Sequence, residues 1–330
     1  MHPRLGREHK DLLRRYTMLF AGRPRRIAGR LLALAGLLFT TTAQAVSFLP
    51  WENVRAYYEA FEFGGITRTV GFLVPANPRP NSPAVIVLHY NLGPSATMAN
   101  LTEVGEFARD KGAFVILPEA HDLTWSHAPN DTDPTDDSGY LNALIDNLVA
   151  RYPIDPKRVY MTGYSQGGNM TVRFACDHPE KIAAGAVVAA TMRKSLERVC
   201  APSVPTPMVF FNGTADDQVP YDVGLISLQR DLTGVGALPA QDAAKWWADA
   251  NGCPGTTTRS NLPVPVADGT SVYVDRYTDC PPGRGAELYT IVEGGHNWPG
   301  ALDFVPRTGL TTQNIRANQE MWQFFERFSR

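Results

Sequence analysis

The chain has 330 residues, of which 44% are hydrophobic and 19% charged, and its formal net charge is −2. Residues 1–45 hold nine Lys and Arg but only two Asp and Glu, so the remaining 285 residues carry 22 cationic against 31 acidic side chains, a net charge of −9. That balance argues against a nucleic-acid partner, which would need Lys and Arg to neutralise phosphates, and 285 residues can bury one large core without a second domain.

Residues 1–45 are typical of an export signal. Four arginines between residues 23 and 30 precede the apolar run Leu31–Phe39, and the small-residue site Ala43–Ala45 follows. The apolar run is much shorter than the ~20 residues of a membrane-spanning helix. We therefore expect cleavage after residue 45, a single catalytic domain over residues 46–330, no membrane attachment after cleavage, and secretion to the periplasm or the medium.

Two features of this signal have alternative interpretations. Translation could begin at Met1 or at Met18, and the later start leaves a signal of ordinary length. The pair Arg25–Arg26 is compatible with twin-arginine export, but Ile27–Gly29 after it matches that signal poorly. General export is the favoured route.

The first elements after the signal are strands. Arg55–Phe63 and Ile66–Pro75 alternate apolar with polar residues and meet at two glycines, which predicts an antiparallel hairpin. Short apolar runs then predict strands that are buried on both faces: Ala84–His89, Ala113–Pro118, Arg158–Thr162, Ala184–Ala190 and Pro207–Asn212. Helical segments are predicted between several of them: Met98–Lys111, Tyr140–Tyr152, Gly168–His178 and Ala240–Asn251.

This alternation of strand and helix predicts an α/β fold with a mainly parallel central sheet and helices on both faces. Ser271–Tyr277 and Glu287–Val292 would extend the sheet, and Thr311–Arg327 would form a closing helix. Ligands of such sheets bind at the carboxyl ends of the strands. Candidate site residues are therefore sought just after predicted strands.

The segment Gly163-Tyr164-Ser165-Gln166-Gly167 lies where a predicted strand passes into a predicted helix. A G-x-S-x-G sequence in this context is typical of a nucleophile elbow, in which the serine occupies a strained turn and small neighbours prevent Cβ clashes. The alternative is an ordinary turn with an inert serine. The context favours Ser165 as a nucleophile.

A serine nucleophile needs a histidine to accept its proton and a carboxylate to orient that histidine. His296 follows the predicted strand Glu287–Val292 and lies far enough downstream of Ser165 for an acid between them. Asp216 and Asp217 both follow the strand Pro207–Asn212, and their order after the serine fits either as the acid.

The developing oxyanion needs two N–H donors, one from the residue after the nucleophile and one from the loop after an earlier strand. Gln166 and the Tyr90–Asn91 region occupy those positions, and Asn91 is preferred because it stands further into the loop. His89 is expected to shape this loop through hydrogen bonds.

Four aromatic residues near the predicted site are candidates for substrate binding: Tyr90, Trp125, Tyr164 and Trp298. Their rings would stack on a hydroxycinnamoyl group or pack against a polyester segment. Packing in the core is an equally good interpretation for Trp125 and Trp298.

The four cysteines are expected to form disulfides, because their number is even and the chain is expected to be exported. Three pairings are possible from the sequence. We favour pairing between nearest neighbours, Cys176 with Cys200 and Cys253 with Cys280. Each bond would close a loop and stabilise the folded state by roughly 3 kcal/mol. No close Cys-x-x-Cys spacing occurs, so no zinc site is expected.

Four segments together resemble the exported polyhydroxybutyrate depolymerase-like and feruloyl esterase group of α/β-hydrolases. They are Leu88–His89, Gly163–Met170, Gly213–Tyr221 and Gly294–Gly300, and the likeness covers about Val54–Arg327. The resemblance implies that the acid is Asp216, two residues after Gly-Thr, and that the histidine is His296. It also implies paired cysteines at the four positions.

The chain departs from this group at two positions. Tyr90 stands where the group usually has glycine, so the backbone beside the second oxyanion donor is more restricted and a ring is expected near the pocket mouth. Asn212 stands where the group often carries histidine. The resemblance implies a secreted serine esterase without cofactor or metal, acting on polyhydroxyalkanoate-type polyesters or on acyl carbohydrate esters. A secreted serine peptidase of the same fold and a non-catalytic polymer-binding protein are the alternatives.

Overall fold

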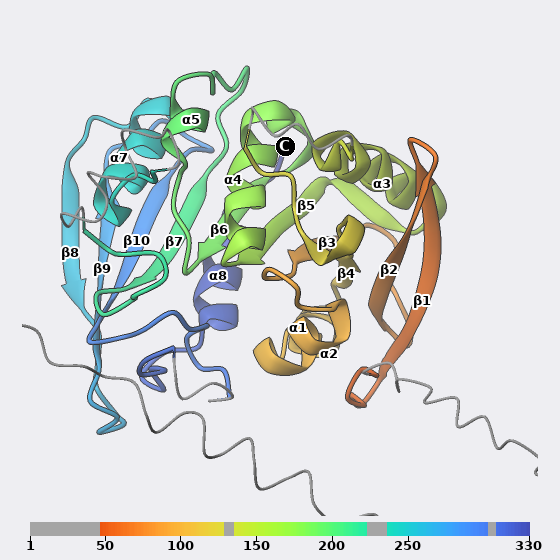
Figure 1. Ribbon diagram of the computed structural model, residues 1–330, viewed down its shortest axis with the longest axis horizontal. Coiled ribbons are helices and arrows are strands. Elements are labelled where there is room, and N and C mark those ends of the chain that lie inside the picture. Colours follow the sequence, from red (N-terminus) through yellow and green to blue (C-terminus); the bar gives the residue numbers. More distant parts are fainter. Residues whose placement is uncertain (1–46, 129–134, 223–235, 303–307) are drawn as a thin grey trace, which may run out of the picture. The chain divides into compact units, whose positions relative to one another are not determined.

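The computed structural model describes residues 47–128, 135–222, 236–302 and 308–330 (Figure 1). The predicted export signal, residues 1–45, lies outside the described residues. Within the described ranges, none of the helices combines the length and the apolar character that crossing a membrane would require.

One ten-stranded sheet runs through the described residues in the order β1-β2-β4-β3-β5-β6-β7-β10-β9-β8. Its six central strands, from β4 to β10 in that order, are parallel to one another. The predicted hairpin β1–β2 is antiparallel and forms one edge, with the register Phe63 opposite Ile66. The strands are β1 (Val54–Phe63), β2 (Ile66–Pro75), β3 (Ser82–Leu88), β4 (Phe114–Pro118), β5 (Ile154–Tyr164), β6 (Ala184–Val188), β7 (Met208–Gly213), β8 (Thr257–Asn261), β9 (Ser271–Tyr277) and β10 (Ala286–Val292).

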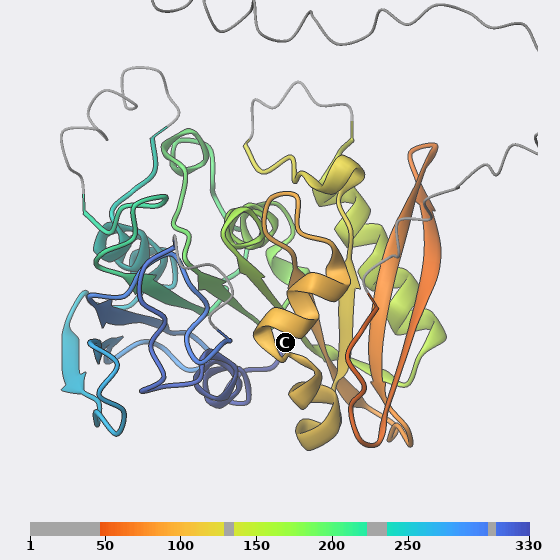
Figure 2. The ribbon, with the colours of Figure 1, turned by 60° about the horizontal axis from the view of Figure 1, so that its bottom comes forward.

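Helices cover both faces of the sheet, as the sequence predicted (Figures 1 and 2). On one face are α3 (Asp137–Arg151), α4 (Gln166–Asp177) and α7 (Ala240–Ala250), and on the other are α1 (Ser95–Thr102), α2 (Gly105–Lys111) and α8 (Ala317–Phe325). Short elements complete the described helices: α5 (Lys194–Glu197), η1 (His121–Leu123) and η2 (Pro179–Lys181). Side chains of β3 alternate between two cores: Val85 and Val87 join the cluster of α1, α2 and α8, whereas Ile86 and Leu88 join that of α3, α4 and α7.

Apart from shifts of up to four residues at element ends and the short helical turns α5, η1 and η2, three elements differ from the sequence prediction. The single helix expected over Met98–Lys111 is two helices, because Glu103 between them adopts a left-handed conformation with φ of 55°. The closing helix begins at Ala317 and not at Thr311, because the Thr312 hydroxyl accepts a hydrogen bond from the Asn314 N–H and competes with helical pairing. Strand β8 was missed because its five residues are almost all exposed and carry no apolar alternation.

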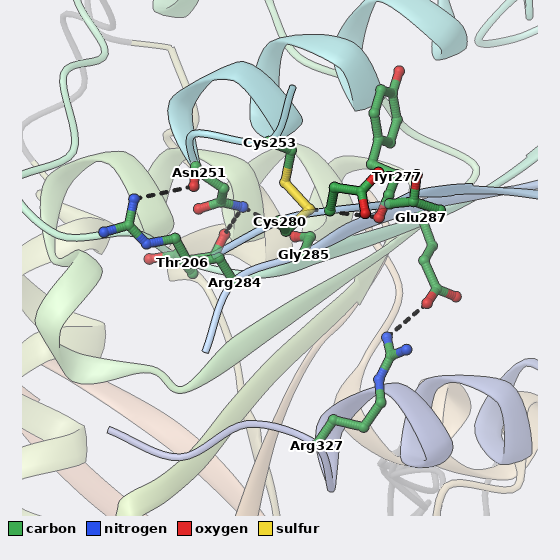
Figure 3. Close-up of a disulfide and its surroundings, with 11 residues drawn as sticks. Thr206, Asn251, Cys253, Tyr277, Cys280, Arg284, Gly285, Glu287 and Arg327 are labelled. Carbon is green, nitrogen blue, oxygen red and sulfur yellow. Dashed lines mark hydrogen bonds and ion pairs between the residues drawn. A yellow bond between two sulfur atoms is a disulfide. The ribbon is translucent and has the colours of Figure 1, made fainter. Parts of the chain in front are cut away.

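Both disulfides join the nearest cysteines in the chain, Cys176 to Cys200 and Cys253 to Cys280. Around the second, shown in Figure 3, the Asn251 side-chain amide donates to the carbonyls of Thr206 and Gly285, 3.0 Å from each. These contacts tie the C-terminal end of α7 to the segments that enter β7 and β10. Those two strands carry the loops described next.

Candidate active site

Ser165 occupies the sharp turn between β5 and α4, with φ of 55° and ψ of −117°. Gly163 and Gly167 make this turn possible. A Cβ on Gly163 would lie 2.2 Å from the Gly167 backbone, and one on Gly167 would lie 2.3 Å from the Leu88 carbonyl oxygen. The strained serine and the close approach of strand and helix are the features that define a nucleophile elbow.

His296 lies between Ser165 and Asp216 and contacts both. Its Nε2 is 2.9 Å from Ser165 Oγ, and its Nδ1 is 2.7 Å from Asp216 Oδ2. A carboxylate accepts hydrogen bonds, so Nδ1 carries the proton that bonds Asp216. Nε2 is then free to accept the Ser165 hydroxyl proton. The three side chains therefore have the hydrogen-bond order of a Ser-His-Asp triad.

The structure separates the two candidate acids. Asp216 is 5% exposed, and its second carboxylate oxygen accepts the backbone N–H groups of Gln218 and Val219, each at 2.8 Å. Asp217 is exposed to solvent. Only Asp216 is both buried and directed at His296.

The loop that carries His296 is held from several sides. The Tyr164 hydroxyl donates to the His296 carbonyl at 2.5 Å, and the His296 N–H donates to the Thr308 carbonyl at 2.7 Å. The loop after β7 joins it, because the Ala215 N–H donates to the Gly294 carbonyl at 2.9 Å. Acid and histidine are thus positioned by backbone contacts between the loops after two adjacent parallel strands.

The two expected oxyanion donors belong to different segments, the start of α4 and the loop after β3. Gln166 is the first residue of α4, so its N–H has no acceptor within the helix. Asn91 lies on the loop after β3, is exposed, and lines the cleft in front of Ser165. Its side-chain oxygen accepts a hydrogen bond from the Thr124 hydroxyl at 3.2 Å, which restricts rotation of the side-chain amide.

His89 shapes this loop, as expected. Its Nδ1 is 2.8 Å from the Tyr90 carbonyl, and its Nε2 accepts the Ala120 N–H at 3.0 Å. The ring is therefore neutral, with its proton on Nδ1. Burial lowers the pKa of His89 to about 4, against the smaller raising effects of the bond to Tyr90 and of the Glu119 charge. His89 stays neutral at physiological pH and fixes the loop after β3 through its bonds to Tyr90 and Ala120.

A cleft of about 580 Å³ opens in front of Ser165. Three of the four aromatic candidates, Tyr90, Tyr164 and Trp298, lie along its walls, although Trp298 is only 2% exposed. Trp125 is not one of the described residues that line the cleft. Trp125 is 1% exposed and lies in the core with α3 and α4, which agrees with the packing alternative and not with substrate contact.

The sequence did not point to several residues of this cleft. Leu49 precedes β1, Thr97, Asn100 and Leu101 come from α1, and Ala301 and Leu302 follow the histidine loop. None of them carries a reactive group or belongs to a recognisable motif. Only the packing of α1 beside the histidine loop brings them to the site.

Comparison with known proteins agrees with this architecture. A family model described as the alpha/beta hydrolase fold matches residues 83–230. The chain is 30% identical to feruloyl esterase B of Piromyces equi over 65% of its length. It is 29% identical to poly(3-hydroxyalkanoate) depolymerase C of Paucimonas lemoignei over 35% of its length. It spans 39% of the first of these proteins and 30% of the second.

A solved structure also resembles the chain. The acetyl xylan esterase from Aspergillus awamori aligns with a TM-score of 0.55 and 17% identity, over 79% of this chain and 94% of that one. At this identity the likeness shows a shared fold.

The chain has the α/β-hydrolase fold, because its sheet and its serine turn have that architecture and the family model matches residues 83–230. The curated relatives named above confirm the resemblance to the feruloyl esterase and depolymerase group. By their names, these relatives are carboxylic ester hydrolases.

Proposed function

We propose that this protein is a secreted serine esterase that works through an acyl-enzyme on Ser165. The observation that carries the proposal is the continuous hydrogen-bonded chain from Ser165 Oγ through His296 to the buried Asp216 carboxylate. A hydroxyl is a weak nucleophile at neutral pH, and this arrangement removes its proton as it attacks.

In the acylation step, Ser165 Oγ attacks the ester carbonyl carbon while His296 Nε2 takes the hydroxyl proton. Asp216 stabilises the imidazolium that forms. The negative charge on the carbonyl oxygen is held by the N–H groups of Gln166 and Asn91. The C–O bond to the alcohol then breaks, and His296 returns the proton to the leaving alcohol.

Deacylation uses the same groups. Water gives a proton to His296 Nε2 and attacks the acyl carbon. As the second tetrahedral intermediate collapses, the bond from the acyl carbon to Ser165 Oγ breaks, His296 returns the proton to Oγ, and the acid is released. Each step needs only these side chains and backbone donors.

The composition of the cleft favours a neutral substrate. Its described lining contains no Lys, Arg, Asp or Glu, and leucine, alanine and aromatic side chains account for much of it. An ester needs no charged partner there. A peptidase that recognises a terminal amine would need a carboxylate, so this lining favours an ester over a peptide substrate. The neutral acyl group would come from a polyhydroxyalkanoate-type polyester or an acyl carbohydrate ester.

We further propose that residues 46–330 are the mature, single-domain enzyme and that residues 1–45 are removed during export. The two disulfides support an oxidising destination, because such bonds are rare in reducing compartments.

The test compares the purified mature protein with Ser165→Ala. Each is incubated with a short nitrophenyl ester, methyl ferulate, a polyhydroxybutyrate suspension and a peptide amide. We expect ester turnover in the wild type and a loss of at least about 10³-fold in Ser165→Ala, because the nucleophile is removed.

Equal ester turnover by both proteins would reject Ser165 as the nucleophile. Amide turnover above ester turnover would establish the peptidase alternative. Absence of turnover on all four substrates by a folded wild-type protein would support the non-catalytic alternative.

A further inference from the structure

Trp125 is buried directly behind the candidate site and makes two hydrogen bonds there. Its indole Nε1–H donates to the His89 carbonyl at 2.9 Å, and its backbone N–H donates to the Gln166 side-chain oxygen at 3.0 Å. The Trp125 and His89 rings are also in contact, with centroids 4.9 Å apart. One residue thus touches both of the segments that supply the proposed oxyanion donors.

The first connection runs to α4. Gln166, the first residue of α4, supplies one proposed N–H donor, and its side-chain oxygen accepts the Trp125 backbone N–H. Because donor and side chain belong to the same residue, fixing the side chain restricts movement of the first turn of α4.

The second connection runs to the loop after β3. The Trp125 indole N–H donates a hydrogen bond to the His89 carbonyl. The His89 ring in turn donates to the carbonyl of Tyr90, the residue before Asn91. The neighbouring Thr124 contacts the Asn91 side chain directly, at 3.2 Å. The segment of residues 124–126 therefore bridges the two sides of the proposed oxyanion hole.

This bridging segment is itself anchored from the core. The Ser126 N–H donates to Asp137 Oδ2 at 2.8 Å, and Asp137 forms an ion pair with Arg68 at 3.1 Å, in which both side chains are at most 1% exposed. Asp137 is the first residue of α3. Loss of either ion-pair partner would leave a buried charge unpaired, so removal of this anchor would be strongly destabilising.

We propose that the Trp125 indole and the Gln166 side chain are positioning residues that hold the two oxyanion donors at a fixed separation. Preorganised donors stabilise the oxyanion because they need no rearrangement as charge develops, and small displacements are costly. The inference rests on the proposed esterase function and extends it to residues that do not contact the substrate.

Two variants test it: Trp125→Phe, which deletes the indole N–H but keeps a large ring, and Gln166→Met, which deletes the acceptor. Each should lower kcat by about 10-fold or more, with KM changed less than about 3-fold, because the transition state is affected more than substrate binding. Rates are expressed per active site, counted by titration with a fluorophosphonate.

Matched controls separate this role from general loss of a tryptophan or glutamine. Trp247→Phe removes an indole N–H that is equally buried but has no hydrogen-bond partner among the described residues. Gln319→Met changes an exposed position on α8. Both controls should keep kcat per titrated site within twofold of the wild type.

A transition-state analogue provides the second readout. The affinity for a trifluoromethyl ketone, whose serine adduct carries an oxyanion, should fall in both variants in proportion to kcat/KM. Wild-type kcat per titrated site in both variants would overturn the proposal, as would a fall in kcat with unchanged affinity for the ketone. If Trp125→Phe does not fold, the same criteria apply to Gln166→Met alone.

Failure of this inference is distinguishable from failure of the esterase proposal. If Ser165→Ala retains ester turnover, the esterase mechanism fails. If Ser165→Ala is inactive while both positioning variants keep wild-type kcat and ketone affinity, only the role of Trp125 and Gln166 is overturned.

Discussion

At the scale of single residues, the Asp216 carboxylate has both oxygens engaged, one by His296 and the other by two backbone N–H groups. Backbone donors fix the side chain without any further charge. Asp216→Asn would keep this shape but would present an amide N–H in place of an acceptor to His296 Nδ1. The histidine would then adopt the tautomer that cannot accept the Ser165 proton.

We therefore predict that Asp216→Asn lowers kcat for ester hydrolysis by about 10³- to 10⁴-fold. Steady-state kinetics on a nitrophenyl ester measure the effect, and circular dichroism checks the fold. Asp217→Asn is the matched control, because the exposed Asp217 should leave kcat within twofold. A larger loss in Asp217→Asn than in Asp216→Asn would show that the acid is Asp217.

His89 predicts a pH dependence of stability. Its pKa is about 4 in the folded protein, lowered by burial, against an ordinary value of 6.5. As pH falls below 6.5, His89 becomes protonated in the unfolded chain but stays neutral in the folded chain. The free energy of unfolding therefore declines until pH reaches about 4. The linked loss at pH 4.5 is about 2 kcal/mol.

This loss is measured by urea unfolding at pH 7.5 and pH 4.5, for the wild type and His89→Gln. The variant should be less stable at pH 7.5, because the braces to Tyr90 and Ala120 are weakened. On acidification it should lose about 2 kcal/mol less than the wild type. Identical acid losses in the two proteins would contradict the assignment to His89.

At the scale of elements, the site depends on where strands end and helices begin. Helix α4 carries Gln166 at its first turn, and near its other end Cys176 is bonded to Cys200. The bond closes a loop with a sequence separation of 24 and restricts the unfolded chain. It acts on stability, whereas the geometry of Ser165 is set by the packing of α4 against β5.

We predict that the double variant Cys176→Ala, Cys200→Ala lowers the free energy of unfolding by about 3 kcal/mol and leaves kcat within twofold. Urea unfolding and ester kinetics measure the two effects. The variant Cys253→Ala, Cys280→Ala should lose a similar amount, since its separation of 27 is nearly equal. A large fall in kcat with little loss of stability would show that the first disulfide positions the site.

At the scale of the whole molecule, the two disulfides agree with the proposed export, because such bonds are rare in reducing compartments. The chain without residues 1–45 has a net charge of −9, and both disulfides lie within it. We predict that the exported protein begins at Val46. N-terminal sequencing of protein recovered from the periplasm or medium measures this, with an intracellular sample as the control. A mature form that retains Leu31–Phe39 would contradict removal of the signal.

The order of elements and most of the site could be predicted from the sequence. Buried parallel strands appear in the sequence as short apolar runs. The serine turn is recognisable from a short motif, because close backbone contacts around the turn require glycine at positions 163 and 167. The break at Glu103 and the polar strand β8 could not be predicted, because neither has a hydrophobic pattern.

The sequence by itself determined the fold class, favoured the disulfide pairing that the structure has, and pointed to Ser165 and His296 as candidate catalytic residues. These depend on periodicity, short spacing and chemistry that few residue types supply. The residues alone left Asp216 and Asp217 open, and the family resemblance implied Asp216. The tertiary structure supplied the physical distinction, since burial and direction depend on the packing of two loops. The tertiary structure also showed that Trp125 is a core residue and not a substrate contact. The sequence could not decide this, because it does not show whether an aromatic ring lines a cleft or lies behind one.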